Sequence, residues 1–196
     1  MKKILILGGS HRDIPLIKAA QELGFFVITL GACSYYLGHK YADKKYLIDF
    51  NDLQTIKKIY FEEKITYIIP GCGEESYINT VILTHQLKIG NFDTIKTAQL
   101  VHNKWRFKEF CLKNGVSTPQ GFHINKMTKS SINFPLIVKP TTLSGGRGVQ
   151  IVKTEQELDS AIKEAQNYSD EIFIEEFIEG KLIAYSIFFI NQKNLF

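Results

Sequence analysis

The first ninety residues alternate short apolar runs with segments of helical periodicity, and this alternation constrains the fold more than any other feature. Residues 3–7 (KILIL) and 26–30 (FVITL) are continuous apolar runs, which are typical of strands buried on both faces of a parallel sheet. Residues 45–50 (KYLIDF) and 67–71 (YIIPG) predict two more strands. The helical segments lie at 13–24, 51–63 and 75–87. Such a βα alternation predicts a doubly wound parallel sheet with right-handed crossovers.

The pattern changes after residue 92. Residues 93–115 predict two helices that are broken near His102 and closed by Gly115. Pro119 lies in a turn that leads into residues 121–124 (GFHI), and a polar connector follows. Four strands are then expected: one that ends at Lys139, and three at 149–152, at 171–178 and at 182–190. A helix over 154–166 is expected to open with a capping box formed by Thr154 and Glu157. Together these elements predict a small α+β domain.

We therefore expect three parts along the chain. Residues 1–92 form the parallel-sheet domain, residues 93–116 a helical connector, and residues 117–196 the α+β domain. The last predicted strand runs almost to Phe196, with no closing helix or partner strand after it. An edge strand left open in this way is a liability, so we expect the chain to be cut short.

Composition and charge exclude several classes of function. The net charge is +4, but the 24 basic residues are scattered among 20 acidic ones without a dense basic tract, which argues against a nucleic-acid partner. No apolar run is long enough to cross a bilayer, so no membrane partner is expected, and "MKKILILGGSHRD" breaks into glycines too early for a signal peptide. The charge balance suits a small anionic ligand.

The cysteines and histidines give no sign of a metal site. Cys33, Cys72 and Cys111 are far apart and form no Cys-x-x-Cys pair, and the five histidines show no metal-ligand spacing. This pattern predicts reduced, buried structural thiols in a cytoplasmic protein rather than a disulfide framework or a zinc site.

Residues 134–149 (FPLIVKPTTLSGGRGV) place Lys139 at the end of an apolar strand, directly before a glycine-rich loop. Glycines in such a loop allow several backbone N–H groups to converge on one anion, and the ammonium group of Lys139 is expected to reach the same oxygens. The lysine precedes the glycines, so this is not a Walker A loop. No helix opens after them, so it is not the dinucleotide-binding fingerprint either.

Two further segments carry candidate nucleotide contacts. Residues 172–180 (IFIEEFIEG) are a strand that ends in Glu175 and Glu176, followed by Phe177, Ile178 and Glu179. An extended segment of this kind offers backbone groups to an adenine edge, apolar contacts to its ring and a carboxylate to its amine or to the ribose. Lys104 begins an amphipathic helix, where a lysine by itself is usually solvated.

In this order, Lys104, Lys139, the glycine loop, the capped helix and "EEFIEG" resemble the ATP-grasp superfamily. The resemblance is to members close to carbamoyl-phosphate synthase large subunits, biotin carboxylase and the carboxylate–amine ligases of purine synthesis. It covers the whole chain: residues 1–90 resemble the pre-ATP-grasp domain, and residues from about 115 resemble the small lid subdomain. The resemblance implies an ATP-dependent ligase that activates a carboxylate as an acyl phosphate for attack by an amine or ammonia. Homodimers are common among such relatives.

The resemblance also implies roles for individual positions. Lys104 and Lys139 match the two lysines on the nucleotide phosphates, and Glu175 to Ile178 match the adenine hinge, mainly through the backbone of Glu176 and Ile178. The loop that closes over the phosphates matches Ser144, Gly145, Gly146, Arg147, Gly148 and Val149. The resemblance places the substrate to be activated near Gly8, Gly9, Glu74 and Glu75, with a plain tight strand–helix turn as the alternative for the two glycines. Apart from the resemblance, His11 is a further candidate to face the substrate, because it follows the glycine turn.

Two positions depart from the family pattern. Many relatives hold the ribose hydroxyls with a glutamate where this chain has Ala184, and Glu179 is the candidate to replace it. The ligands for Mg²⁺ lie in the family on later strands, so the metal that accompanies ATP is expected to bind beyond Phe196.

Two alternatives to the ligase remain. The first is an ATP-binding fragment without turnover. The second is a dinucleotide-dependent oxidoreductase domain, which "GGSHRD" disfavours because it lacks the Gly-x-Gly-x-x-Gly spacing.

Overall fold

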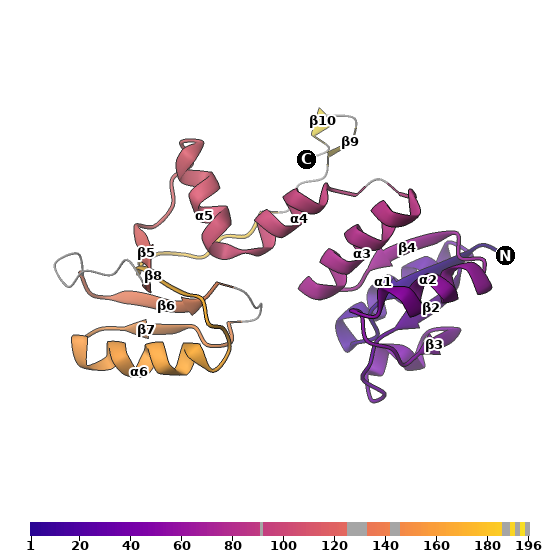
Figure 1. The fold of residues 1–196 in the computed structure, drawn as a ribbon, viewed down its shortest axis with the longest axis horizontal. Coiled ribbons are helices and arrows are strands. Elements are labelled where there is room, and N and C mark those ends of the chain that lie inside the picture. Colours follow the sequence, from indigo (N-terminus) through magenta and orange to yellow (C-terminus); the bar gives the residue numbers. More distant parts are fainter. Residues whose placement is uncertain (91, 125–132, 142–145, 186–188, 191–192, 195–196) are drawn as a thin grey trace. The chain divides into compact units, whose positions relative to one another are not determined.

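The computed structural model describes residues 1–196 apart from 91, 125–132, 142–145, 186–188, 191–192 and 195–196. The chain divides into two compact units (Figure 1). The first comprises Met1–Val116 with Thr141–Arg147, and the second comprises Ser117–Pro140 with Gly148–Phe196. Each unit has its own sheet and its own hydrophobic core.

The first unit contains a four-stranded parallel sheet. Its strands are β1 (Lys3–Leu7), β2 (Phe26–Leu30), β3 (Lys44–Tyr46) and β4 (Tyr67–Pro70), in the order β3-β2-β1-β4. Its helices are η1 (His11–Asp13), α1 (Ile14–Glu22), η2 (Leu37–Lys40), α2 (Leu53–Glu62), α3 (Glu74–Leu87), α4 (Ile95–His102) and α5 (Lys104–Lys113). The chain starts in the middle of the sheet and winds outward in both directions, so the predicted doubly wound fold class is confirmed.

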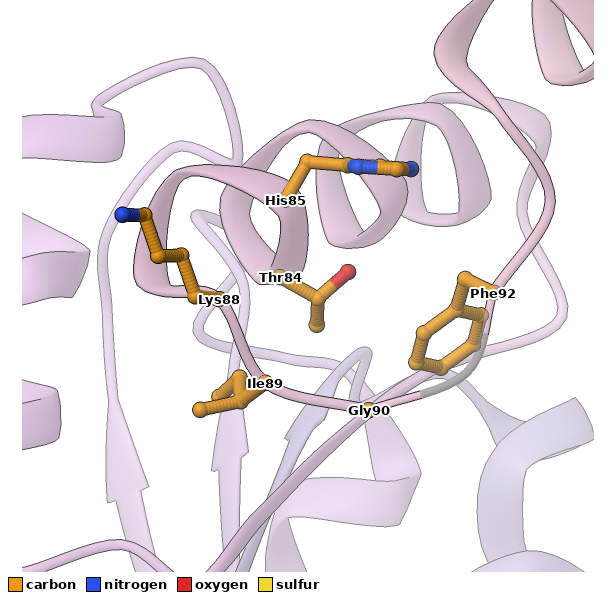
Figure 2. Close-up of a pocket in the computed structure, with 6 residues that line it drawn as sticks. All are labelled: Thr84, His85, Lys88, Ile89, Gly90 and Phe92. Carbon is orange, nitrogen blue, oxygen red and sulfur yellow. The ribbon is translucent and has the colours of Figure 1, made fainter.

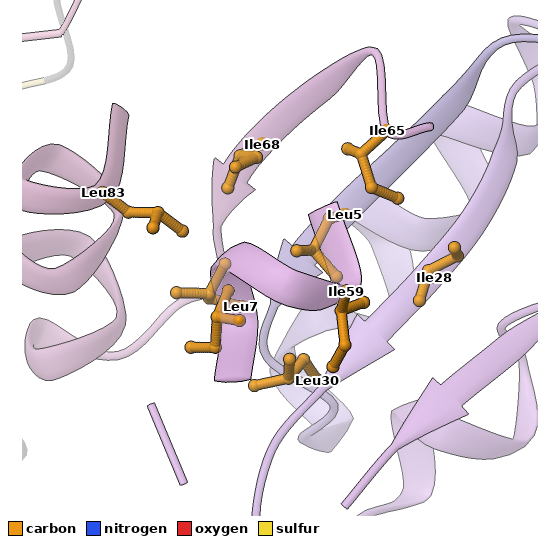
Figure 3. Packing of buried hydrophobic residues seen from close by; sticks show 9 residues of the cluster. Leu5, Leu7, Ile28, Leu30, Ile59, Ile65, Ile68 and Leu83 are labelled. Atoms are coloured by element: carbon orange, nitrogen blue, oxygen red, sulfur yellow. The ribbon is translucent and has the colours of Figure 1, made fainter. Parts of the chain in front are cut away.

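The apolar strands are buried on both faces, as the continuous runs predicted. On one face, Leu5, Leu7, Ile28 and Leu30 pack with residues of α2 and α3 (Figure 3). On the other face, the alternate side chains pack against α1. Burial of each such side chain stabilises the fold by about 1.5–3 kcal/mol. The core therefore holds the strand ends, and the turns that follow them, in a defined position.

Local signals set the helix ends. Asp52 caps α2 by accepting a hydrogen bond from the Thr55 N–H at 3.0 Å, as one of the two predicted caps. Asn103 caps α5 in the same way through the Arg106 N–H at 2.9 Å, which produces the predicted break after His102. Gly115, with φ +71°, follows α5 in the left-handed conformation that favours glycine.

The second unit contains a four-stranded antiparallel sheet covered by one helix. The strands are β5 (Gly121–His123), β6 (Leu136–Pro140), β7 (Gln150–Val152) and β8 (Ile172–Glu176), in the order β5-β8-β6-β7. The helix is α6 (Glu155–Gln166), whose apolar face packs on side chains of β6, β7 and β8. A further antiparallel pair consists of β9 (Phe189–Ile190) and β10 (Lys193–Asn194).

Two local predictions were wrong. The third strand is only Lys44–Tyr46, because Asp49 accepts a hydrogen bond from the Asn51 N–H at 2.8 Å and turns the chain instead of extending it. The Thr154 side chain makes no cap, and Glu157 accepts from the Lys153 N–H at 2.8 Å rather than from Thr154. The two groups of the expected capping box therefore do not bind each other.

The chain end also differs from the prediction. Residues 182–185 are not a strand, and Leu182 and Tyr185 are 96% and 85% exposed. Their apolar pattern is that of a strand, but a strand requires a neighbouring backbone to bind, and none of the described strands lies beside them. Phe189–Ile190 does have a partner strand, namely Lys193–Asn194, contrary to the expectation of an unpaired end.

Candidate functional site

The face of the second sheet opposite α6 carries a lysine–glutamate pair. Side chains alternate along a strand, and Val138 and Ile174 point toward α6, so Lys139 and Glu175 point to the other face. The Lys139 ammonium group donates a hydrogen bond to a carboxylate oxygen of Glu175. It also lies 4.6 Å from the centroid of the Phe173 ring. The anion that faces Lys139 in this structure is therefore a carboxylate of the protein itself.

The environment of this pair makes its charges functionally significant. The side chain of Lys139 is 19% exposed and that of Glu175 is 9% exposed. A charge this far removed from water requires an opposite charge or several hydrogen bonds, and the aromatic ring adds a favourable contact for the cation. An ammonium group held in this way, yet still partly open to solvent, is suited to bind phosphate oxygens.

The segment after β8 leaves the sheet at the position expected of the adenine hinge. The Glu176 N–H donates to the Gln120 carbonyl at 2.8 Å, and the Glu176 carboxylate accepts from the Gln120 N–H at 2.8 Å. The Phe177 N–H donates to the Pro135 carbonyl at 3.0 Å. Ile178 is 60% exposed and, within the described residues, its N–H donates no hydrogen bond. The side chain of Glu176 thus holds the end of β8 to Gln120, whereas the Ile178 N–H is available to a ligand.

Glu179 and Gly180, which follow Ile178, are exposed. Glu179 therefore lies just beyond the segment predicted as the adenine hinge, at an exposed position.

The glycine loop is described only in its second half. Ser144 and Gly145 lie outside the described residues. Gly146 and Gly148 have φ values of +73° and +69°, in the left-handed region, so glycine is required at both positions. Arg147 and Val149 are exposed, and Val149 directly precedes β7.

Lys104 is the first residue of α5 and belongs to the first unit, whereas Lys139 belongs to the second. The Lys104 N–H donates to the carbonyl of the fully buried Thr141 at 3.0 Å. The start of α5 is therefore attached to the backbone that enters the glycine loop.

The first unit has a pocket of about 80 Å³ at the carboxyl ends of β1 and β4. It is lined by residues of the β1–η1 turn, by Tyr36 and Phe50, and by residues of the β4–α3 turn. Open parallel sheets bind ligands in this position, because the strand order reverses there and the helices on the two faces diverge.

Asp13 organises this pocket, and the prediction from sequence missed it. One carboxylate oxygen accepts from the Gly9 N–H at 2.9 Å and from the Ser10 N–H and hydroxyl, both at 2.8 Å. The other oxygen accepts from the Cys72 N–H at 2.7 Å. Burial alone would raise the pKa of Asp13, but these hydrogen bonds outweigh it and hold the pKa below its ordinary value. The spacing Ser10-x-x-Asp13 before an apolar helix is the sequence signal that points to such a cap.

The turn glycines serve close packing rather than anion binding. A Cβ on Gly8 would lie 2.8 Å from an Asp13 carboxylate oxygen, and one on Gly9 would lie 2.2 Å from the His39 ring. The Gly9 and Ser10 N–H groups are bound to Asp13, so they cannot hold a dinucleotide pyrophosphate. This further disfavours the oxidoreductase alternative.

The other predicted substrate residues lie around the same pocket. His11 is exposed and lines a neighbouring open pocket with Arg12, Tyr35 and Tyr36. Glu74 and Glu75 form the first turn of α3, where their charges favour the positive end of the helix dipole. Neither glutamate lines the pocket in the described residues.

A second cavity in the first unit lies at the other end of α3 (Figure 2). It is lined by Thr84, His85, Lys88, Ile89, Gly90 and Phe92. The His85 ring forms a hydrogen bond with the Asp93 carbonyl at 3.0 Å, so its role there is to hold the loop that leads to α4.

The described residues contain no group of three or more His, Cys, Asp or Glu side chains that could hold a metal ion. All three cysteines are free thiols, but the prediction that all are buried was wrong, since Cys72 is exposed at the end of β4 beside the pocket. No helix among the described residues combines the length and the apolar character needed to span a bilayer.

A parallel-sheet unit followed by an antiparallel, helix-covered sheet is the fold of a known class, the ATP-grasp proteins. Residues 98–195, half of the chain, match the family model described as "D-ala D-ala ligase C-terminus". The chain therefore belongs to this family of the ATP-grasp superfamily.

Individual proteins and solved structures are also similar to this chain. The chain is 28% identical to a formate-dependent phosphoribosylglycinamide formyltransferase of a Nitratiruptor species, over 98% of this chain and 51% of that protein. The N5-carboxyaminoimidazole ribonucleotide synthetase structure of Thermotoga maritima is 25% identical, with a TM-score of 0.68, over 91% of this chain and 47% of the other. The biotin carboxylase domain of the Hydrogenobacter thermophilus 2-oxoglutarate carboxylase, solved with MgADP, is 26% identical, with a TM-score of 0.72, over 91% of this chain and 44% of the other. The chain thus spans about half the length of the relatives it matches.

Proposed function

We propose that this chain is the nucleotide-binding part of an ATP-dependent ligase that activates a carboxylate as an acyl phosphate. A carboxylate oxygen attacks the γ-phosphorus of ATP, the bond to the β-phosphate oxygen breaks, and ADP leaves. An amine or ammonia then attacks the acyl carbon, and inorganic phosphate leaves. The proposed division into residues 1–92, 93–116 and 117–196 assigns the acid to the first part and the nucleotide to the last.

The observation that carries this proposal is the Lys139–Glu175 pair on the face of the second sheet opposite α6. Lys139 neutralises phosphate charge, and Glu175 keeps the lysine oriented and accepts from the exocyclic amine of adenine. The exposed backbone of Ile178 binds the adenine edge, and Glu179 takes the ribose hydroxyls in place of the residue at Ala184. Lys104 and the loop 144–149 complete the phosphate contacts.

The pocket at the ends of β1 and β4 is proposed for the acid or the amine. Its glycine turn is already occupied by Asp13, so a ligand there is recognised by Arg12, His11 and Tyr36 rather than by the turn amides. Formate is the first acid to test, because the curated relatives are named for it.

One ATP-grasp neighbour has been solved with MgADP, and Mg²⁺ supplies charge neutralisation on the phosphates when it is bound. The described residues form no metal-binding group, so no step is assigned to a metal-binding residue of this chain.

Isothermal calorimetry with ATP tests the nucleotide site. Lys139→Ala is expected to weaken ATP binding at least tenfold, because it removes a charge-assisted phosphate contact worth about 1.5–3 kcal/mol. Lys163→Ala, on the exposed side of α6, is the matched control and is expected to bind ATP normally. NAD is expected not to bind. Absence of ATP affinity in the wild-type chain, or equal affinity of both variants, would contradict the proposal.

Turnover separates a ligase from a binding fragment. Release of ADP and phosphate that depends on both formate and an amine supports the ligase, whereas ATP binding without such release supports the fragment. A homodimer and a cytoplasmic location are part of the proposal, and light scattering of the purified chain tests the dimer.

A further inference from the structure

His39 is a buried polar side chain that neither the ATP site nor the Asp13 cap explains. It lies in η2 and is 4% exposed. Its Nδ1 shares a hydrogen bond of 2.8 Å with the Thr29 hydroxyl on β2. Its Nε2 is buried and has no hydrogen-bond partner among the described residues. A buried polar atom without a partner costs free energy, so a reason for keeping it is required.

The ring of His39 lies directly against the glycine turn of the pocket. A Cβ on Gly9 would be 2.2 Å from the His39 Cε1 and 2.6 Å from its Nε2, so no other residue fits there. The His39 N–H donates to the Gly9 carbonyl at 3.2 Å. A Cβ on Gly38 would be 2.4 Å from the Ser10 carbonyl oxygen. Residues 38–39 and 9–10 therefore contact each other backbone to backbone.

The His39 ring also contacts Tyr36, another residue that lines the pocket. Tyr36 stacks on His39, with ring centroids 6.1 Å apart and an interplanar angle of 30°. Tyr36, Gly9 and Ser10 all line the pocket. His39 thus joins the glycine turn to the tyrosine wall by contacts with both.

The groups around the ring oppose a positive charge. Burial above all, and then Lys45 on β3, hold the pKa of His39 below its ordinary value, while the Gly31 carbonyl after β2 and Asp13 in η1 act in the other direction. Thr29 and Tyr36 are the neutral groups in contact with it. Both oxygens of Asp13 already accept hydrogen bonds from the turn. For a charged ring the Gly31 carbonyl is the one backbone acceptor among the described residues that favours the proton, and it does not outweigh the burial. Gly9 occupies the space beside Nε2 where water would otherwise bind.

We propose that neutral His39 is a positioning residue that locks the glycine turn to the Tyr36 wall, and that its protonation releases this lock and opens the pocket. The pocket's ligand rests on the proposed function, but the lock is a property of the free protein. The direction of the pH dependence follows from the burial of His39, which lowers its pKa in the folded protein. As the pH falls below about 6.5, histidine in the unfolded chain takes up a proton before the buried ring does. The folded state with the closed pocket therefore loses stability as the pH falls in that range.

NMR of the ligand-free protein tests the lock between pH 8 and 5. The amide signals of Gly9, Ser10 and Gly38 are expected to shift with one apparent pKa, equal to that of the His39 ring and below 6.5. In His39→Asn, which keeps a hydrogen-bonding group for Thr29 but does not titrate, these shifts are expected to disappear. His123→Asn, on β5 in the second unit, is the control and is expected to leave them unchanged.

Two results would overturn the proposal. One is a His39 ring that titrates while the three amide signals stay constant, which can be seen in the wild-type chain even if the variant fails to fold. The other is an unchanged pH dependence in His39→Asn. Neither result depends on ATP, so loss of ATP binding in Lys139→Ala would still support the ligase if the lock failed.

Discussion

Two glycine-rich turns follow a buried strand in this chain, and they use their glycines for different physical reasons. In the turn after β1, a side chain on Gly8 or Gly9 would collide with Asp13 or His39. In the turn before β7, a Cβ on Gly146 would meet no atom of the described residues within 4 Å, but its φ is +73°. Packing thus requires glycine at both positions of the first turn, whereas at Gly146 only the backbone conformation requires it. The other glycine of the second turn, Gly148, is required on both grounds, because its φ is +69° and a Cβ there would lie 2.8 Å from the Tyr168 ring.

The difference matters for function, because amides already bound to a carboxylate do not bind a phosphate. Asp13 takes up the N–H groups of the first turn, so glycine enrichment alone misidentifies it as an anion site. The comparison can be tested by changing each turn separately.

The largest expected effect comes from Asp13→Ala. The change leaves the N–H groups of Gly9, Ser10 and Cys72 without their acceptor, at about 1–3 kcal/mol for each buried group. We expect the free energy of unfolding of the first unit to fall by about 3 kcal/mol in urea denaturation. Asp159→Ala, on the exposed side of α6, is the control and should change it by less than about 0.5 kcal/mol. A similar small effect for Asp13→Ala would show that the cap is unimportant.

Alanine in each turn tests the comparison directly. Gly9→Ala is expected to cost about 2 kcal/mol or more, because the methyl group would overlap the His39 ring. Gly146→Ala is expected to cost about 1 kcal/mol, which is the strain of a left-handed φ alone. Thermal unfolding of both variants measures the difference, and equal costs would contradict this distinction between the two turns.

A change of Lys139, the lysine before the second glycine turn, is expected to have a smaller effect on the free energy of unfolding. Lys139→Met keeps a long apolar side chain but removes the ammonium group that binds the Glu175 carboxylate and lies over the Phe173 ring. We expect a loss of about 1.5 kcal/mol, less than for a fully buried pair, because the lysine side chain is 19% exposed. The double variant Lys139→Met/Glu175→Gln should recover part of this loss in the same urea titration. No recovery would mean that the two side chains do not interact.

The smallest effect is expected at the amino ends of the strands of the first sheet, away from the pocket. There the Glu63 carboxylate is held by side chains instead of by backbone amides of a turn. Glu63 contacts Lys3 at 2.6 Å, Lys44 at 2.5 Å and the Tyr46 hydroxyl at 2.6 Å. These hydrogen bonds lower the pKa of Glu63 to about 2. Glu63→Gln is expected to cost about 1 kcal/mol at pH 7, since Lys3 and Lys44 are substantially exposed.

The pH dependence of this cluster has a definite sign. A carboxyl group with a lowered pKa stabilises the fold above its unfolded value of about 4.5, and the contribution is lost as the pH falls toward about 2. The difference in unfolding free energy between wild type and Glu63→Gln should therefore shrink between pH 5 and 2. A constant difference would assign the effect to packing instead of charge.

Much of the fold could be predicted from local patterns. The apolar runs located β1, β2 and β4, and turn and cap residues such as Asp52 and Gly115 located helix ends. The failures occurred where a segment had the composition of a strand but no backbone partner, as at 182–185, or where Asp49 turned the chain early. Hydrogen-bond partners of this kind come from other parts of the chain and are not encoded in a local pattern.

The candidate site, like the fold, could be predicted only where its signals are local in the sequence. Lys139 and the glycine loop stood out by their order along the chain, but the pairing of Lys139 with Glu175 depends on the register of β6 against β8. Asp13 had only a short capping signal, and His39 had none, because its partners Gly9 and Thr29 lie on other elements.

By itself, the sequence determined the fold class, the lysine before the loop and the hinge segment, because periodicity and motif order are local properties of the chain. Only the tertiary structure decided which polar groups are already satisfied. It bound the Gly9 and Ser10 amides to Asp13, placed the Lys139 ammonium on Glu175 and left the His39 Nε2 buried. The reason is physical: a hydrogen bond needs two groups within about 3 Å, and strand register and loop packing bring together residues that are far apart in sequence.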